Sequence, residues 1–314
     1  MIWVGVAFFE AACWGAIVVL NKSVLRYVTP LGTNVLVRIA SLVGVTAVTV
    51  PLTVLHLWDV TFAMTWSAFG YISIAAVVIW LVAFNTYYYA LRSGRVGVVT
   101  PLTSIDPLFA ALFAAALIGA TIGGLTILGL AVATGGILLI SRWMHADPAV
   151  GTEVLAPPTP GDVKTSRPEV VLLSLVTAAG WGLGPVLIQL ALQSVGGAST
   201  TMMLQSQAMG LLMLGAVVLG RRARVLVRPL KPAERRTVVL LIVFAGVLET
   251  AFSVLYYLVI EHIGAVLTVL IGSTAPLFAI LLGVLVLRER FGRRLALAAA
   301  VTLTGVFLAT LDRL

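Results

Sequence analysis

Hydrophobic residues gather along this chain in ten long blocks that are separated by short polar stretches. Each block has about 20 residues, the length that an α-helix needs to cross ~30 Å of hydrocarbon. The pattern therefore predicts an all-α polytopic membrane protein with ten transmembrane helices. The blocks lie at 2–22, 31–55, 67–91, 96–118, 122–142, 169–192, 198–220, 237–260, 264–287 and 293–312.

The second five blocks repeat the first five. The segment Ser104–Ala110 (SIDPLFA) recurs 169 residues later as Ser273–Ala279 (STAPLFA), and Trp14 returns as Trp181 at an offset of 167. Because five spans are an odd number, the second copy must enter the bilayer from the opposite face. Transporters use such inverted repeats, with the substrate near mid-membrane between the halves. The 169-residue offset also relates Tyr87 to Tyr256, Gly123 to Gly292, Gly136 to Gly305 and Trp80 to Glu249.

A polar segment separates the two sets of blocks. Residues 144–168 contain five prolines and several charges, a composition typical of an extended, solvated linker. We therefore expect a first five-helix repeat at 1–143, a Pro-rich linker at 144–168 and a second five-helix repeat at 169–314.

Composition excludes a soluble domain, because a chain with 61% hydrophobic and 10% charged residues cannot cover a water-exposed surface. Its one cysteine, Cys13, lies inside a hydrophobic block, which excludes a disulfide or a cysteine-based metal site. The sequence also lacks a Gly-rich phosphate loop, a His-Glu-x-x-His pair and a serine nucleophile with an evident base. It therefore predicts neither an enzyme nor a bound metal.

Basic residues are distributed unevenly about the blocks. Of the 20 lysines and arginines, 18 lie in or beside the connections after blocks one, three, five, seven and nine, and the opposite connections and tails hold only Arg313. Basic residues near span ends stay on the cytoplasmic side. We expect an integral plasma (inner) membrane protein whose linker is cytoplasmic and whose termini both face outward. The basic cluster Arg221–Arg236 is expected to contact anionic lipid headgroups, not nucleic acid.

Several short motifs resemble the drug/metabolite transporter superfamily, in its ten-helix branch of paired EamA-type domains. They are Ala12-Cys-Trp14-Gly15 with Asn21-Lys22, Arg38, Tyr89-Ala-Leu91-Arg-Ser-Gly94, Pro107-Leu-Phe109, and Leu287-Arg-Glu289-Arg-Phe-Gly292 before Gly305. Their order and duplication cover nearly the whole chain. The first half departs from the pattern, because Gly119-Ala120-Thr121 stands where the second half has Arg288-Glu289-Arg290.

The resemblance implies a secondary carrier for a small organic solute, often an exporter, without a bound cofactor. Within transport, the alternative is a flippase for a lipid-linked or long-chain metabolite. From another class, a membrane-embedded enzyme, a sensor or a scaffold is the alternative. The substrate, the direction of transport, and whether the protein is a monomer or a homodimer stay open.

Four ionisable residues fall inside the blocks, where such residues are costly and mark functional pathways. Glu10, Arg38, Asp106 and Glu249 all lie near the membrane midplane. Arg38 and Asp106 lie at similar depths, and we expect them to form a structural ion pair. Glu10 and Glu249 have no basic neighbour in their own blocks. We expect Glu10 to serve proton coupling and Glu249 to bind substrate.

Aromatic and amide side chains accompany these charges. Deep tyrosines and tryptophans need partners in protein or in a hydrated cavity, and an aromatic and acidic lining suits an amphipathic amine or amino-acid-like solute. Pro107 and Pro276, at equivalent places, are expected to kink their helices and act as hinges. The predicted substrate-binding residues are Trp14, Trp80, Tyr87, Glu249, Tyr256 and Gln205.

Overall fold

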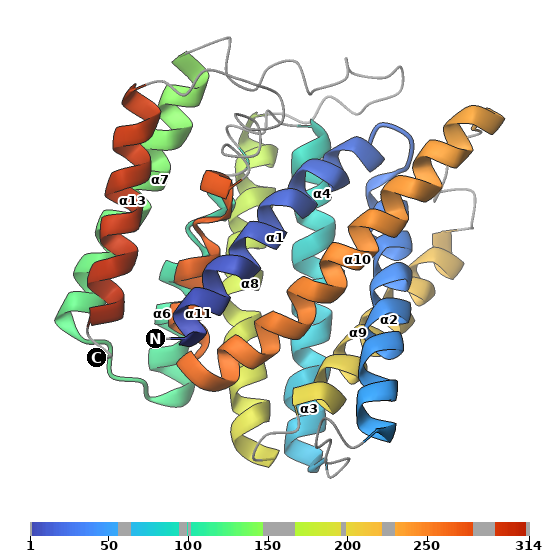
Figure 1. Cartoon of the computed structure of the whole chain (residues 1–314), viewed down its shortest axis with the longest axis horizontal. Coiled ribbons are helices and arrows are strands. Elements are labelled where there is room, and N and C mark those ends of the chain that lie inside the picture. The colour runs from blue at the N-terminus through green and yellow to red at the C-terminus, as the bar shows by residue number, and fades with distance from the viewer. Residues whose placement is uncertain are drawn as a thin grey trace.

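A computed structural model describes residues 2–55, 64–93, 99, 102–146, 167–195, 199–221, 230–278 and 293–311. Every regular element in these ranges is a helix (Figure 1). The first half contains α1 (Ile2–Val24), α2 (Pro30–Val54), α3 (Trp66–Ala76), η1 (Val77–Ala83), α4 (Phe84–Ser93), α6 (Asp106–Ile118) and α7 (Gly124–Ala146). The second half contains α8 (Arg167–Val195), α9 (Ser199–Arg221), α10 (Pro232–Ile263), α11 (Ala265–Gly272) and α13 (Arg293–Leu311).

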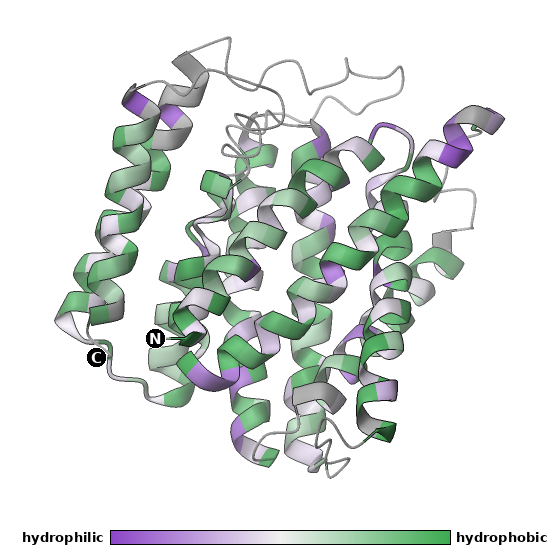
Figure 2. Cartoon of the chain, viewed as in Figure 1, coloured by the Kyte–Doolittle hydropathy of each residue, from purple (hydrophilic) through white to green (hydrophobic). Residues whose placement is uncertain are grey.

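These helices provide the ten predicted apolar segments in the predicted order. Six helices within the described residues are long and apolar enough to cross a membrane, and four shorter apolar helices accompany them. The third segment, Trp66–Arg92, is continuous through α3, η1 and α4. Large apolar side chains such as Phe9, Val43 and Phe244 are exposed on the surface, where lipid can cover them. Hydrophobic residues predominate along the helices (Figure 2). The expected all-α, polytopic membrane fold is confirmed.

The helix contacts are symmetric between the two halves. The packing of α1 against α10 has its counterpart in the packing of α8 against α3, and the packing of α6 against α8 has its counterpart in α11 against α1. Three further contacts join helices of equivalent spans directly: α2 with α9, α6 with α11, and α7 with α13 (Figure 1). This exchange pattern requires a two-fold relation between the repeats, as expected for five-helix units inserted in opposite directions.

Small residues bring α7 and α13 into close contact, and they do so twice. A Cβ atom added to Gly136 would overlap Thr302, and one added to Gly305 would overlap the backbone of Ala133. Residues 136 and 305 are equivalent under the 169-residue offset, and so are residues 133 and 302. The same glycine contact therefore occurs on both sides of the crossing, as in membrane helices that pack through small residues.

The two prolines that we expected to kink continuous helices instead follow helix interruptions. Residues 104–105 form a turn, and α6 begins at Asp106 with Pro107 in its first turn. At the equivalent place α11 ends at Gly272, residues 273–274 form a turn, and Pro276 lies at the start of the helical residues 275–278. Proline lacks a backbone N–H and is tolerated in the first turn of a helix. After residue 278, the next residue that the structure describes is Arg293.

Two predicted features lie partly outside the described residues. The structure does not describe most of the linker, residues 147–166, or the centre of the basic cluster, residues 222–229. The helix ends that flank these segments are described. The ends of α4 and α7 and the starts of α10 and α13 lie toward one end of the bundle (Figure 1). These ends carry Arg92, Arg142, Arg235 and Arg294.

Candidate functional site

A buried ion pair lies where α2 meets α9 and α10. The guanidinium of Arg38 donates from Nη2 to Glu249 Oε1 at 2.6 Å and from Nη1 to Gln207 Oε1 at 3.1 Å. The side chains of Arg38 and Glu249 are 1% and 0% exposed. A charged hydrogen bond of this kind is what makes a buried charge tolerable in a dry environment.

The predicted pair between Arg38 and Asp106 is therefore wrong, because Arg38 pairs with Glu249, for which the sequence offered no basic partner within its own block. The physical reason is helix packing. Helix α2 packs against α10 and α9, whereas α6, which carries Asp106, packs against α8 and α11. Equal depth in the membrane did not make Arg38 and Asp106 neighbours.

Trp80 covers the guanidinium of Arg38. The Cζ atom of Arg38 lies 3.5 Å from the centroid of the Trp80 ring, a close cation–π contact. The indole Nε1 donates to Ser206 Oγ at 2.8 Å, so the polar edge of this buried ring is bonded. Gly210 gives the indole its space, since a Cβ atom there would lie 2.6 Å from Trp80 Cδ1. Arg38 is thus held by a carboxylate, an amide and an aromatic face.

The backbone at Trp80 has a π-helical conformation. The π-helix η1 interrupts the third span between α3 and α4, and the carbonyl of Trp80 accepts a hydrogen bond from Asn34 Nδ2 at 2.7 Å. Such π-helical turns inside α-helices occur frequently at functional sites. The hydrophobic pattern contained no signal for this π-helix.

Two neighbouring glutamines on α9 point in different directions. Gln207 bonds Arg38 and donates from Nε2 to Ser253 Oγ at 3.0 Å. Gln205, which we predicted to bind substrate, turns toward α3 and donates to Ser73 Oγ at 3.3 Å. Residues two positions apart lie on nearly opposite faces of a helix. Gln207 is thus a site residue that our sequence analysis missed, although the 169-residue offset from Arg38 could have indicated it.

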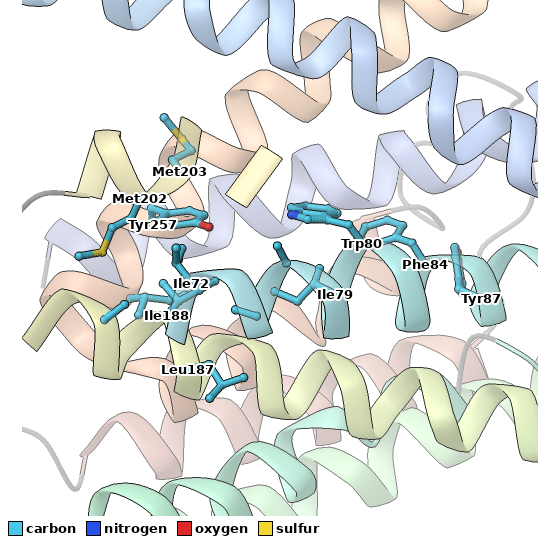
Figure 3. Packing of buried hydrophobic residues seen from close by; sticks show 14 of the residues in the cluster. Ile72, Ile79, Trp80, Phe84, Tyr87, Leu187, Ile188, Met202, Met203 and Tyr257 are labelled. Atoms are coloured by element: carbon cyan, nitrogen blue, oxygen red, sulfur yellow. The ribbon is translucent and has the colours of Figure 1, made fainter. Parts of the chain in front are cut away.

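Aromatic rings form a connected cluster beside this ion pair. Trp14 on α1 is its centre, with ring centroids 5.2 Å from Phe252, 5.5 Å from Trp181 and 5.7 Å from Phe84. Trp80 and Phe84 follow one another along η1 and α4, with Tyr87 one turn further (Figure 3). We call these rings the aromatic cluster. Its members are Trp14, Trp80, Phe84, Tyr87, Trp181, Phe252 and Tyr256.

The cluster brings together four of the residues predicted to bind substrate. Trp80 contacts Phe84, Phe84 contacts Trp14, and Trp14 lies 6.4 Å from Tyr87 between ring centroids. Tyr256 joins through Phe252, at 5.2 Å. Trp14 and Tyr256 remain partly exposed, whereas Trp80 and Tyr87 are buried. The cluster therefore contains accessible aromatic surface in the middle of the bundle.

Two carboxyl groups border the cluster near Tyr256. Glu10 lies one turn before Trp14 on α1, and Asp106 is the first residue of α6. The two carboxyl groups lie near each other and near the Tyr256 hydroxyl. Neither Glu10 Oε2 nor Asp106 Oδ1 has a hydrogen-bond partner among the residues that the structure describes. A Cβ atom on Gly272, the last residue of α11, would lie 4.0 Å from Glu10 Oε2. These acids thus lie close to both helix interruptions.

The arrangement can bind an amphipathic molecule but offers no metal site in the described ranges. There, no group of three or more His, Cys, Asp and Glu side chains is placed to hold a metal ion. The aromatic faces can stack on an apolar body, and the acids near Tyr256 can accept a positive charge or a proton.

Comparisons with known proteins agree with this architecture. The profile described as the EamA-like transporter family matches residues 1–142 and 169–311, once for each repeat. A search of curated proteins finds no match. Among solved structures, a crystal structure described only as that of a protein is similar over 99% of this chain and 98% of its own, with a TM-score of 0.69 and 17% sequence identity. At this identity the likeness concerns the fold alone.

Proposed function

Because this chain belongs to the EamA-like transporter family, and is thus an integral multi-pass membrane transporter of the drug/metabolite type, we propose that it is a secondary carrier for a small amphipathic organic solute with an amine group. We further propose that it exports this solute by alternating access, in exchange for protons. The observation that carries the proposal is the aromatic cluster with two carboxyl groups at its edge.

The aromatic cluster fits the apolar part of such a solute. Trp14 and Tyr256 have partly exposed rings, whereas Trp80 and Tyr87 form the buried part of the same cluster. An ammonium group gains from ring faces and from nearby carboxylates together. Glu10, one helical turn from Trp14, is placed to accept that charge.

Glu10 is also the proposed proton carrier. A buried carboxyl group that does not form an ion pair can exist with or without its proton, and a solute cation and a proton can then compete for it. Alternate occupancy of one site by two cations produces exchange. Pro107 and Pro276 are the proposed hinges, because both spans are interrupted immediately before them.

Reconstituted vesicles test this proposal. With phenyltrimethylammonium, a permanently charged aromatic cation, we expect uptake into vesicles whose interior is more acidic than the medium. Glu10→Gln should reduce this gradient-driven uptake more than tenfold, because the glutamine cannot exchange a proton. It should leave measurable counterflow, which needs no proton gradient.

The matched control is Glu261→Gln. Glu261 is an exposed acid near the end of α10, so its replacement should change neither uptake nor counterflow. Gradient-driven uptake that survives Glu10→Gln unchanged would remove the proton role of Glu10. Wild-type protein that binds no organic cation would remove the proposed class of solute.

A further inference from the structure

The Arg38 side chain of the buried ion pair lies at the two-fold axis that relates the repeats. Arg38 is eight residues after the first residue of α2, and Gln207 is eight residues after the first residue of α9. The two positions are equivalent, and their side chains are hydrogen-bonded to each other. Equivalent positions of two related halves can touch only at the axis between them. Inverted-repeat transporters bind their substrates at this interface.

The neighbours of this contact are also equivalent pairs, but with different chemistry. The offset that relates Arg38 to Gln207 relates Trp80 to Glu249 and Phe84 to Ser253. In the first half, Arg38 lies over the rings of Trp80 and Phe84, with Cζ 5.5 Å from the Phe84 centroid. In the second half, Gln207 bonds Ser253. One half thus supplies a cation on aromatic rings, and the other supplies an amide, a hydroxyl and a carboxylate.

Only one ring separates this charge from the partly exposed Trp14 of the proposed solute site. Phe84 contacts Arg38 on one side and lies 5.7 Å from Trp14, between ring centroids, on the other. A unit charge at roughly 10 Å, with an effective dielectric constant near 20, changes a binding constant by about tenfold. The charge state of this pair therefore matters to any charged solute beside Trp14.

Glu249 does not bond all the N–H donors of the Arg38 guanidinium. The pair is joined through one oxygen, and Arg38 Nε and Glu249 Oε2 lack hydrogen-bond partners within the described part of the chain. The role of Glu249 toward Arg38 is thus chiefly to balance its charge. With Arg38 balanced, Glu10 and Asp106 determine the charge of the mid-membrane region.

We propose that Glu249 determines the charge preference of the transporter by neutralising Arg38 on the two-fold axis. Glu249 acts through Arg38 and does not touch the solute. The paired state favours organic cations, and an unbalanced Arg38 favours organic anions that carry the same apolar group. This inference rests on the proposed transport of an amphipathic solute.

The experiment compares two permanently charged probes of similar size, phenyltrimethylammonium and benzenesulfonate. The full-length protein is reconstituted in vesicles, and half-saturation concentrations for counterflow give the ratio of preference. Glu249→Gln should shift this ratio about tenfold toward benzenesulfonate. Gln207→Glu, which adds a carboxylate next to Arg38 and leaves Glu249 in place, should shift it in the opposite direction.

Two further variants separate charge from structural damage. Arg38→Gln combined with Glu249→Gln removes both charges and should restore the wild-type ratio, which a general loss of packing could not do. Glu261→Gln makes the same substitution on the same helix at an exposed position and should have no effect. If Glu249→Gln does not fold, Gln207→Glu decides alone.

A second measurement distinguishes failure of this inference from failure of the proposed function. Iodide and caesium quench the fluorescence of accessible tryptophans, and the ratio of their quenching constants reports local charge without any transport. If the wild type carries neither probe, the proposed function fails and the quenching ratios still decide the inference. Unchanged ratios in both charge variants, or shifts in the same direction, overturn it.

Discussion

The guanidinium of Arg38 has three kinds of contact in one place: a carboxylate, an amide and an aromatic face. All of them come from other spans, so this side chain joins α2 to η1, α9 and α10. A buried charge of this kind contributes little net stability when it is paired. It becomes very costly when one partner is removed, because the remaining charge stays in a dry environment.

We therefore expect Arg38→Ala to destabilise the protein by roughly 3–5 kcal/mol, because Glu249 is left buried without its cation. Thermal unfolding of the purified protein in detergent measures the effect. Replacing both partners with apolar residues, as Arg38→Met with Glu249→Leu, should recover most of the loss. If Arg38→Ala unfolds at the same temperature as the wild type, the ion pair of Arg38 and Glu249 is not formed in the protein.

At this scale the sequence indicated which residues matter better than it indicated their partners. Ionisable residues are rare in apolar blocks, so Glu10, Arg38, Asp106 and Glu249 were evident, and the structure places all four inside the bundle. Their pairing depends on which helices touch. Hydrophobic blocks carry no such information, and equal depth led us to pair Arg38 with Asp106.

Helices α7 and α13 show how single small residues determine the packing of whole elements. At their crossing the backbones approach so closely that Gly136 has no space for a Cβ atom beside Thr302. The adjacent Gly135 faces open space, with no atom within 4 Å of an added Cβ. The two glycines therefore form an internal comparison of a contact position and a free position.

We expect Gly136→Val to separate α7 from α13 and to destabilise the protein by about 1–3 kcal/mol, the usual cost of overpacking. Gly135→Val, with the same added volume one residue away, should have a much smaller effect. Thermal unfolding of the two variants under identical conditions gives the comparison. Equal destabilisation by both substitutions would mean that helix propensity, not the crossing, is responsible.

The hydrophobic pattern predicted the existence and order of the helices but not their internal irregularities. The segment 67–91 was expected as one regular helix, and the structure has a π-helix at Val77–Ala83 within it. In that conformation the Trp80 carbonyl accepts a hydrogen bond from the Asn34 side chain, which lies on another helix. Likewise, proline indicated a kink at residues 107 and 276, but the turns before them were not evident from the sequence.

The whole molecule is organised by its inverted repeat, and this makes the orientation in the membrane testable. Basic residues lie at one end of the bundle. The third and fifth spans of the first half end there, with Arg92 and Arg142, and the third and fifth spans of the second half begin there, with Arg235 and Arg294. An even number of spans places both termini on the same side, opposite to that basic end. Basic residues near span ends favour the cytoplasmic side.

We predict that both termini face the exterior. A C-terminal alkaline phosphatase fusion should be active, and a C-terminal green fluorescent protein fusion should be dark when it is exported through the general secretory route. The same reporters fused after residue 150, within the linker, should give the reverse result. A fluorescent C-terminal fusion would place the basic end outside and contradict the charge rule for this protein.

The contact between Arg38 and Gln207 also bears on how such a molecule could arise from the duplication of a shorter gene. In an ancestor built from two identical copies, the residue at this position would meet itself across the axis. Two arginines there would bring two guanidinium groups within hydrogen-bonding distance in a dry interior, where like charges repel strongly. A single buried cation at this place is compatible only with copies that are free to differ. Divergence of the two copies therefore had to precede the appearance of Arg38 opposite an amide.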